Sequence, residues 1–160
     1  MGKYLALIAV LGSAYGVYRL SFYKSPAYQA YLQWAKAADA GDCATLQGMS
    51  ESAAKKWADG FCSPEDSILV FGNTISGKSR AEILKDMNAT KISFDPPRHE
   101  LQSENQADDG TVSLVVNESL STRPSDFNKT PAPRRHDVML KEINGAWKLM
   151  DFRESDLPAR

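Results

Sequence analysis

Residues 134–154 read RRHDVMLKEINGAWKLMDFRE, and they predict the fold more directly than any other stretch of the chain. Two runs of alternating apolar and polar residues flank Asn144 and Gly145, the dipeptide that most strongly favours a two-residue turn between antiparallel strands. We therefore expect the chain to close with a β-hairpin. Just upstream, residues 111–121 (TVSLVVNESLS) alternate in the same way and predict another long strand.

The middle of the chain mixes strand and helix signals. Residues 91–104 (KISFDPPRHELQSE) predict a strand that bends at Pro96 and Pro97, because proline cannot donate to a β-ladder. Residues 67–75 (SILVFGNTI) are rich in β-branched and aromatic residues and predict a single strand. Residues 78–87 (KSRAEILKDM) carry apolar residues at helical spacing and predict a short amphipathic helix.

Helices are expected before these strands. Residues 26–42 (PAYQAYLQWAKAADAGD) have one apolar face, begin with proline after a serine cap, and end at Gly41. Residues 43–49 and 51–60 predict two further short helices. Helices followed by antiparallel strands indicate an α+β fold in which three N-terminal helices cover one face of a curved, mostly antiparallel sheet. Such a sheet can enclose a conical cavity.

Three stretches in this order resemble the nuclear transport factor 2-like superfamily, also described as SnoaL-like or cystatin-like α+β. They are YLQWAKAADAGDCATLQGM (31–49), ISGKSRAEILKDM (75–87) and INGAWKLMDFRE (143–154). The resemblance covers roughly residues 26–155 and implies that residues 25–160 form one SnoaL-like domain. It also implies that an enzyme of this class would work inside the cone, with a carboxylate or histidine as base. Membrane-anchored relatives exist in the superfamily.

Residues 1–24 are apolar from Tyr4 to Tyr23 apart from Arg19, which is about the 20 residues that a transmembrane helix needs. Two interpretations are open: a retained membrane anchor, or a signal sequence removed after Ala14. The aromatic residues that follow favour the anchor, because such residues suit a membrane interface. Gly12 and Gly16 form a GxxxG pair, which predicts a close contact with another transmembrane helix.

The charge and the cysteine content limit which partners, metal ions and compartments the sequence favours. With 19 Lys and Arg, 20 Asp and Glu, and a net charge of −1, the chain lacks the basic surface of a general nucleic-acid binder. Cys43 and Cys62 are either buried free thiols or one disulfide, and two cysteines with two histidines make a zinc site unfavourable. We expect no metal and no cofactor. The cysteines favour a single-pass protein of the bacterial inner membrane whose domain lies in the periplasm.

Candidate catalytic residues are few. Glu118 shares an apolar strand face with Val116 and would be a base in apolar surroundings, unless the strand ends at Asn117 and leaves the side chain in water. Asp151 faces inward if the last strand is regular, and otherwise lies in water or in a salt bridge. His99 and His136 each stand where a strand begins, which favours a surface position.

The loop STRPSDFNKTPAPRR (121–135) is unusually long for a compact domain, so it is either disordered or binds a partner. Phe127 is its candidate anchor, and Arg134 and Arg135 its basic end. These features favour a membrane-anchored, non-catalytic accessory or assembly subunit of a larger membrane complex, contacting the bilayer and other subunits. The alternative is a small-molecule-binding protein or a lyase- or isomerase-type enzyme that holds a small apolar ligand in the cone.

Overall fold

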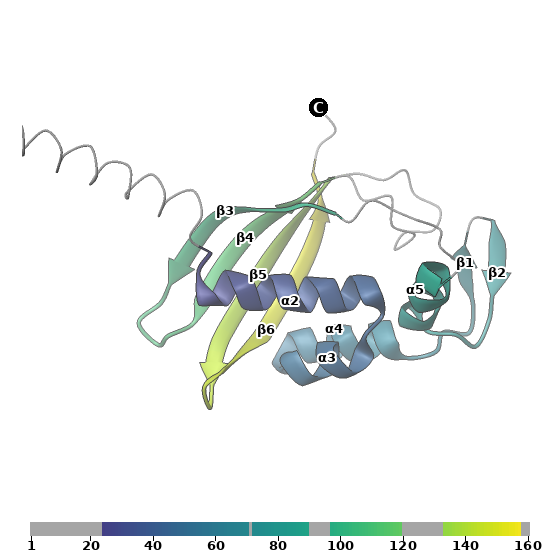
Figure 1. Cartoon of the computed structure of the whole chain (residues 1–160), viewed down its shortest axis with the longest axis horizontal. Helices are drawn as coiled ribbons and strands as arrows, with labels where there is room; N and C mark the ends of the chain where they lie inside the picture. The colour runs from purple at the N-terminus through teal and green to yellow at the C-terminus, as the bar shows by residue number, and fades with distance from the viewer. Residues whose placement is uncertain (1–23, 71, 90–96, 120–132, 158–160) are drawn as a thin grey trace, which may run out of the picture.

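The computed structural model describes residues 24–70, 72–89, 97–119 and 133–157. Its centre is a four-stranded antiparallel sheet in the order β3-β4-β5-β6, formed by β3 (His99–Gln106), β4 (Val112–Glu118), β5 (Arg134–Ile143) and β6 (Ala146–Asp156). The sheet curves around the helix α2 (Pro26–Ala40), which crosses its concave face (Figure 1). This is an α+β fold with helices packed on an antiparallel sheet, as the sequence predicted.

The two ends of helix α2 are set by capping residues. The Ser25 side chain accepts a hydrogen bond of 3.1 Å from the Tyr28 backbone N–H, and Pro26 occupies the first turn. Gly41 ends the helix with φ at 65°, a left-handed conformation in which a side chain is strained. A Cβ at Gly41 would also lie 2.3 Å from the Ala81 carbonyl oxygen, so glycine is needed here on both counts.

Two short helices follow and lean on the same sheet. Helices α3 (Cys43–Met49) and α4 (Ser52–Cys62) are joined by a disulfide between Cys43 and Cys62. Between them, the Glu51 backbone N–H donates a 2.7 Å hydrogen bond to the Leu149 carbonyl oxygen of β6. The disulfide and this backbone bond therefore hold the helical layer against the last strand.

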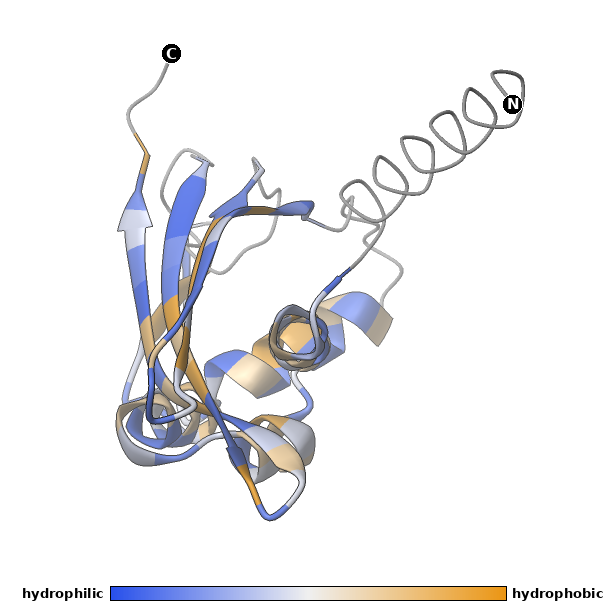
Figure 2. Cartoon of the chain, turned by 90° about the vertical axis from the view of Figure 1, so that its left-hand side faces the viewer, coloured by the Kyte–Doolittle hydropathy of each residue, from blue (hydrophilic) through white to orange (hydrophobic). Residues whose placement is uncertain are grey.

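The sheet buries one face of each central strand. In β4, and in β5 from Arg134 to Leu140, every second residue is buried, and these buried rows end at Glu118 and Arg134. Hydrophobic and hydrophilic residues are correspondingly mixed along the strands (Figure 2). The β5–β6 hairpin turns at Asn144 and Gly145, both with positive φ, as the dipeptide predicted. The register of this hairpin shifts once: Met139 pairs with Asp151, but Leu140 pairs with Leu149, so β6 contains one extra residue.

The expected single strand over residues 67–75 is wrong in detail. The segment forms a small antiparallel pair, β1 (Ile68–Val70) and β2 (Asn73–Ile75), with Gly72 at positive φ between them. Glycine at this position allows the chain to reverse tightly. The β-branched residues on both sides of it favour strands, so the sequence predicted one continuous strand. The helix α5 (Arg80–Ala89) follows, and its Ile83 packs with β1 in a second, smaller apolar cluster beside the end of α2 (Figure 1).

The main core fills the space between α2 and the sheet. Trp34 is 2% exposed, and its ring lies 4.9 Å from that of Trp57 and 4.7 Å from that of Phe152, centroid to centroid. The indole N–H of Trp34 donates to the Ser50 hydroxyl at 2.8 Å, and that hydroxyl donates to the Leu46 carbonyl oxygen at 2.7 Å. The Trp34 indole N–H and the Ser50 hydroxyl are therefore both hydrogen-bonded inside the core.

Several predictions concern segments outside the described residues. The anchor over residues 1–24 is one, apart from Lys24, and so are Gly12, Gly16 and Phe127. Among the helices of the described segments, none is both long and apolar enough to cross a membrane.

Candidate functional site

Polar side chains gather at one end of the concave face, where the apolar rows of the sheet stop. Glu118 ends β4, Arg134 and His136 begin β5, and Glu154 lies near the end of β6. The strand register sets them side by side, because His136 pairs with Glu154 across the ladder, and Glu118 pairs with Arg134 on one side and with His99 on the other. The alternation that buries valine and leucine elsewhere turns these side chains inward.

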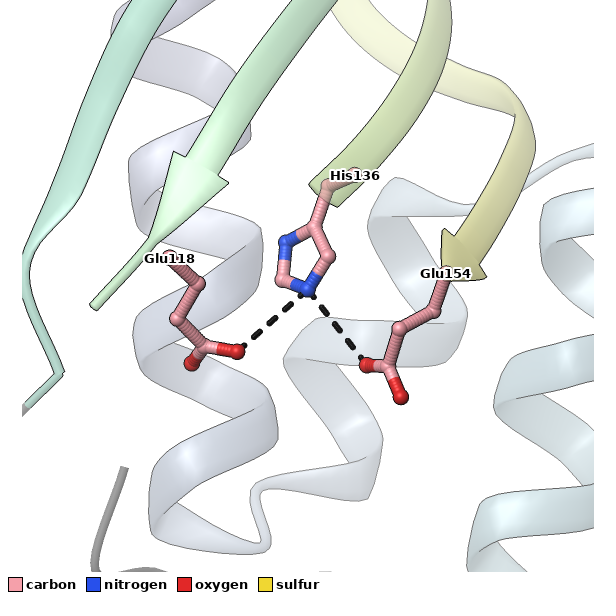
Figure 3. Close-up of side chains that lie close together, drawn as sticks. All are labelled: Glu118, His136 and Glu154. Atoms are coloured by element: carbon pink, nitrogen blue, oxygen red, sulfur yellow. Dashed lines mark ion pairs between the residues drawn. The ribbon is translucent and has the colours of Figure 1, made fainter. Parts of the chain in front are cut away.

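At the centre, three side chains converge, which we call the Glu–His–Glu cluster: Glu118, His136 and Glu154 (Figure 3). His136 Nε2 lies 3.4 Å from Glu118 Oε2 and 3.4 Å from Glu154 Oε2. Glu118 is 2% and His136 5% exposed, so both groups are removed from water. At 3.4 Å these contacts are long for hydrogen bonds, and within the described part of the chain no group forms a hydrogen bond of good geometry with Nε2.

Tyr31 of α2 reaches this cluster from the helix layer. Its hydroxyl oxygen lies 2.6 Å from His136 Nδ1 and 3.0 Å from His99 Nδ1. A hydroxyl has one proton to donate and can accept others, so Tyr31 connects the two imidazole rings in a hydrogen-bonded chain. Tyr28, one helical turn earlier, donates its hydroxyl proton to the His99 carbonyl oxygen at 2.8 Å. Tyr31 thereby holds both imidazole rings, and Tyr28 holds the backbone of His99.

The electrostatics of the site follow from these contacts. Burial alone would lower the pKa of His136, but its contacts with Glu118 and Glu154 outweigh burial and leave that pKa above its ordinary value. Burial would raise the pKa of Glu154, yet His136 and Arg134 hold it below its ordinary value. Arg134 Nη1 is 3.2 Å from Glu154 Oε1, the carboxylate oxygen turned away from the imidazole.

The cavity beside the cluster is small. About 50 Å³ of space lies between the polar residues and a wall made by Trp34, Trp57, Phe61 and Phe152. A shallower cleft of about 350 Å³ adjoins it and shares Trp57, Phe61, Arg134 and Glu154 with its lining. Pockets that bind drug-sized molecules usually have about 300–1,000 Å³, so only the outer cleft approaches that size.

A larger hollow lies elsewhere in the described structure. It has about 630 Å³ and sits where α2, α3 and α5 meet, near Asp42 and Glu82. Both carboxylates already accept hydrogen bonds from backbone N–H groups at the start of a helix. Asp42 caps α3 by accepting from the Thr45 backbone N–H at 3.1 Å, and Glu82 accepts from the Ser79 backbone N–H at 2.7 Å. This hollow therefore offers little unoccupied polar chemistry.

The structure places the candidate residues as follows. Glu118 belongs to the strand, which continues past Asn117, so its side chain is buried and not in water. Asp151 points away from the cluster and pairs with Arg153 at 3.0 Å, because the extra residue in β6 reverses the expected alternation. The surface position expected for His136 is wrong, since the ring is buried, and His99 is half-buried.

Arg134 and Arg135, predicted as the basic end of the long loop, lie on opposite faces of β5. Arg134 is 8% exposed and faces the cluster, whereas Arg135 is exposed and pairs with Asp137 at 2.8 Å. Neither belongs to a loop, because β5 begins at Arg134. Only Arg135 therefore remains accessible as a contact for a partner protein.

Two residues of the site were missed by sequence reasoning. Glu154 faces inward only because of the bulge in β6, which no pattern in the sequence announces. Tyr31 was assigned to the apolar face of its helix, and nothing in the sequence indicated that its hydroxyl would meet two histidines. The prediction of no metal site considered cysteine and histidine spacing and left the carboxylates out.

Comparison with known proteins adds only the likeness of the fold. No protein-family profile matches the sequence. No curated protein matches it either. Solved structures that resemble it include an NTF-2 like protein of unknown function from Silicibacter pomeroyi, 11% identical with a TM-score of 0.45, covering 81% of this chain and 91% of that chain.

Two further structures have a similar arrangement. One is a putative calcium/calmodulin-dependent protein kinase type II association domain from Thiobacillus denitrificans, 14% identical, TM-score 0.47, covering 85% of this chain and 98% of that chain. The other is an uncharacterized protein with a cystatin-like fold from Caulobacter vibrioides, 14% identical, TM-score 0.42, covering 82% and 88%. NTF-2-like and cystatin-like are the fold classes that the sequence resembles. A likeness at this level says nothing about an activity, a ligand or a partner.

Proposed function

We propose that this chain is a non-catalytic accessory or assembly subunit of a membrane protein complex. The observation that carries the proposal is the filled interior of the cone, where Trp34, Trp57 and Phe152 pack against one another and leave about 50 Å³. A cone that is closed by its own side chains favours a rigid body for protein contacts over a substrate chamber. The apolar residues 1–24 supply the second part of the proposal, a transmembrane helix that joins the complex.

The proposed location is the bacterial inner membrane, with the domain in the periplasm. The disulfide between Cys43 and Cys62 supports this side of the membrane, because disulfides persist in oxidising compartments and are rare in the cytosol. Contacts with other subunits would use the strip at Gly12 and Gly16 in the membrane. On the domain, Phe127 and Arg135 are the proposed partner-binding residues.

The test replaces the small residues of the proposed contact. Substituting leucine for both Gly12 and Gly16 keeps the span apolar but forces neighbouring helices apart, so insertion should survive and partners should be lost. The measurement is quantitative mass spectrometry of what co-purifies with the chain after gentle detergent extraction. Leu5→Ile is the matched control and should change nothing. If the double variant retains all its partners, the segment is not the recognition element.

A second candidate is a small-molecule lyase or isomerase, and one observation favours it. His136 lies between two carboxylates and touches Tyr31, which is a combination suited to moving protons. The outer cleft of about 350 Å³ ends at Arg134 and Glu154, so a small apolar substrate with one polar group could approach the cluster from there.

Glu118→Gln separates the two functions. The accessory proposal expects the biological activity of the chain to stay nearly unchanged, provided that circular dichroism shows an intact fold. The enzyme candidate expects a loss of at least about 100-fold, because removing a positioned acid or base typically costs that much. The control is Asp151→Asn, which makes the same chemical change on the opposite face of the sheet.

A further inference from the structure

We infer that the Glu–His–Glu cluster is a binding site for one divalent transition-metal ion of the zinc type. Its three ligand atoms would be Glu118 Oε2, His136 Nε2 and Glu154 Oε2. The inference does not depend on the proposed function, because an ion joining β4, β5 and β6 would brace the cone whether or not a substrate enters it.

The distances suit such an ion. Ligands about 2.1 Å from a tetrahedral zinc ion lie about 3.4 Å from one another. His136 Nε2 is 3.4 Å from each carboxylate oxygen, and all three ligand atoms lie within 4.8 Å of one another. Figure 3 shows the two carboxylates on either side of the imidazole nitrogen, with all three side chains directed toward one point. A small rotation of either glutamate would complete the ligand triangle.

The second observation is the imidazole nitrogen itself. His136 is 5% exposed, and its Nε2 has no well-formed hydrogen bond to any group in the described segments. A buried polar atom without a hydrogen bond is costly, and such an atom often marks an absent ion or water. Nε2 is aimed between the two carboxylates, where a cation would give this nitrogen the partner that it lacks among the described residues (Figure 3).

Tyr31 supports the ring in the way that metal sites require. Metal-bound histidines usually donate the other ring N–H to a neighbouring acceptor, which fixes the ring and frees the ligand nitrogen. Here Nδ1 of His136 lies 2.6 Å from the Tyr31 hydroxyl oxygen, which can accept that proton and pass its own hydrogen bond to His99. Tyr31 is therefore a positioning residue for the proposed site.

The surrounding charges and space also fit. Arg134 engages Glu154 Oε1 at 3.2 Å, whereas Glu154 Oε2 lies 3.4 Å from the imidazole nitrogen and is the oxygen placed to bind an ion. The adjoining cavity of about 50 Å³ exceeds the room that one water needs, so a water can serve as the fourth ligand.

The ligand set selects the metal. One imidazole and two carboxylates suit Zn²⁺, whereas Ca²⁺ takes six to eight oxygen ligands and Mg²⁺ keeps most of its waters. Ions such as Mn²⁺ and Fe²⁺ should bind the same atoms less tightly, following the usual affinity order of divalent transition metals. We therefore expect Zn²⁺ to bind more tightly than Mn²⁺, and Mg²⁺ not to compete.

The experiment uses the full-length chain in mild detergent, purified without a histidine tag and stripped with a chelator. Zn²⁺ alone is added, and binding is followed by isothermal titration calorimetry and by the melting temperature. The expected result is one Zn²⁺ per chain and a higher melting temperature, which the chelator reverses. A wild-type chain that binds no Zn²⁺, or shows only weak binding that Mg²⁺ displaces, would overturn the inference.

Variants locate the ion. Glu154→Gln should weaken Zn²⁺ binding at least about 100-fold, and Tyr31→Phe about tenfold, because outer partners of a metal ligand contribute 10–100-fold. Glu154 is the decisive position, since its side chain is 38% exposed and the variant should fold even if Glu118→Gln does not. Asp151→Asn, three ladder pairs away from the His136–Glu154 pair, should bind Zn²⁺ like the wild type. Equal affinity in Glu154→Gln and the wild type would contradict the site.

Discussion

Replacing Trp34 with alanine should open the cone and test whether that side chain fills it. The indole is 2% exposed and packs on Trp57 and Phe152. Truncating a buried tryptophan to alanine costs about 3–5 kcal/mol in unfolding free energy, through lost burial and the cavity that remains. The lost hydrogen bond to Ser50 adds about 1 kcal/mol or less, since the Ser50 hydroxyl still donates to Leu46. We therefore expect a loss of about 4 kcal/mol within that range.

The assay is urea unfolding of the full-length chain in mild detergent, followed by far-UV circular dichroism. The midpoint should fall while the slope stays unchanged, because the folded state keeps its extent. Trp57→Ala is the control: this ring lines the same cavity but is partly exposed, so its loss should be smaller.

Ligand rescue gives a second reading of the same variant. An apolar cavity made by truncation can bind a small aromatic molecule, so indole should raise the melting temperature of Trp34→Ala and leave the wild type unchanged. A loss below about 1 kcal/mol, well under the usual cost of a buried tryptophan, would refute the reasoning. So would indole binding to the wild type, which would mean that the cone is already open.

Three further predictions concern local features. Replacing Cys43 and Cys62 by serine should lower the unfolding free energy by about 3 kcal/mol in urea titrations, since the disulfide closes a separation of 19 residues. The Asp109 carboxylate accepts hydrogen bonds from Thr111 and Lys141, which lower its pKa to about 2. Its contribution to stability is therefore complete at pH values above its ordinary pKa of 3.8 and is lost as the pH falls towards 2. Carboxyl NMR should show the lowered pKa, and an unshifted pKa would contradict the prediction. Gly41→Ala should destabilise the fold by more than about 1 kcal/mol in thermal melts, because φ is positive at this position and the added Cβ would lie 2.3 Å from the Ala81 carbonyl oxygen. An unchanged melting temperature would argue against the role of Gly41 in ending α2.

Local sequence signals predicted the main helix, the closing hairpin and the inner face of β4. Asn144 and Gly145 marked the hairpin, and the serine cap, the proline and Gly41 marked the ends of α2. Period-two alternation also placed Glu118 on the inner face, because β4 and its neighbours are regular there. These features depend on a few adjacent residues, which is why they can be read from the chain.

The polar site could not be assembled in the same way. One extra residue in β6 turns Asp151 out and Glu154 in, and a bulge depends on how two strands pair. The contact of Tyr31 with His99 and His136 joins residues 68 and 105 positions apart, so it exists only after α2 docks on the sheet. The sequence left open whether the strand ends at Asn117, because strand boundaries are hard to predict; the ladder with His99 and Arg134 continues through Glu118.

The most direct test of the proposed accessory role is the mass of the particle that contains this chain. Native mass spectrometry of the protein, released from its own membranes in mild detergent, should give a particle much heavier than 17.6 kDa whose other subunits differ from this chain. Intact-mass analysis of the same sample should show residues 1–24 still attached. A chain that runs alone, or a particle weighing a whole multiple of 17.6 kDa, would contradict the account.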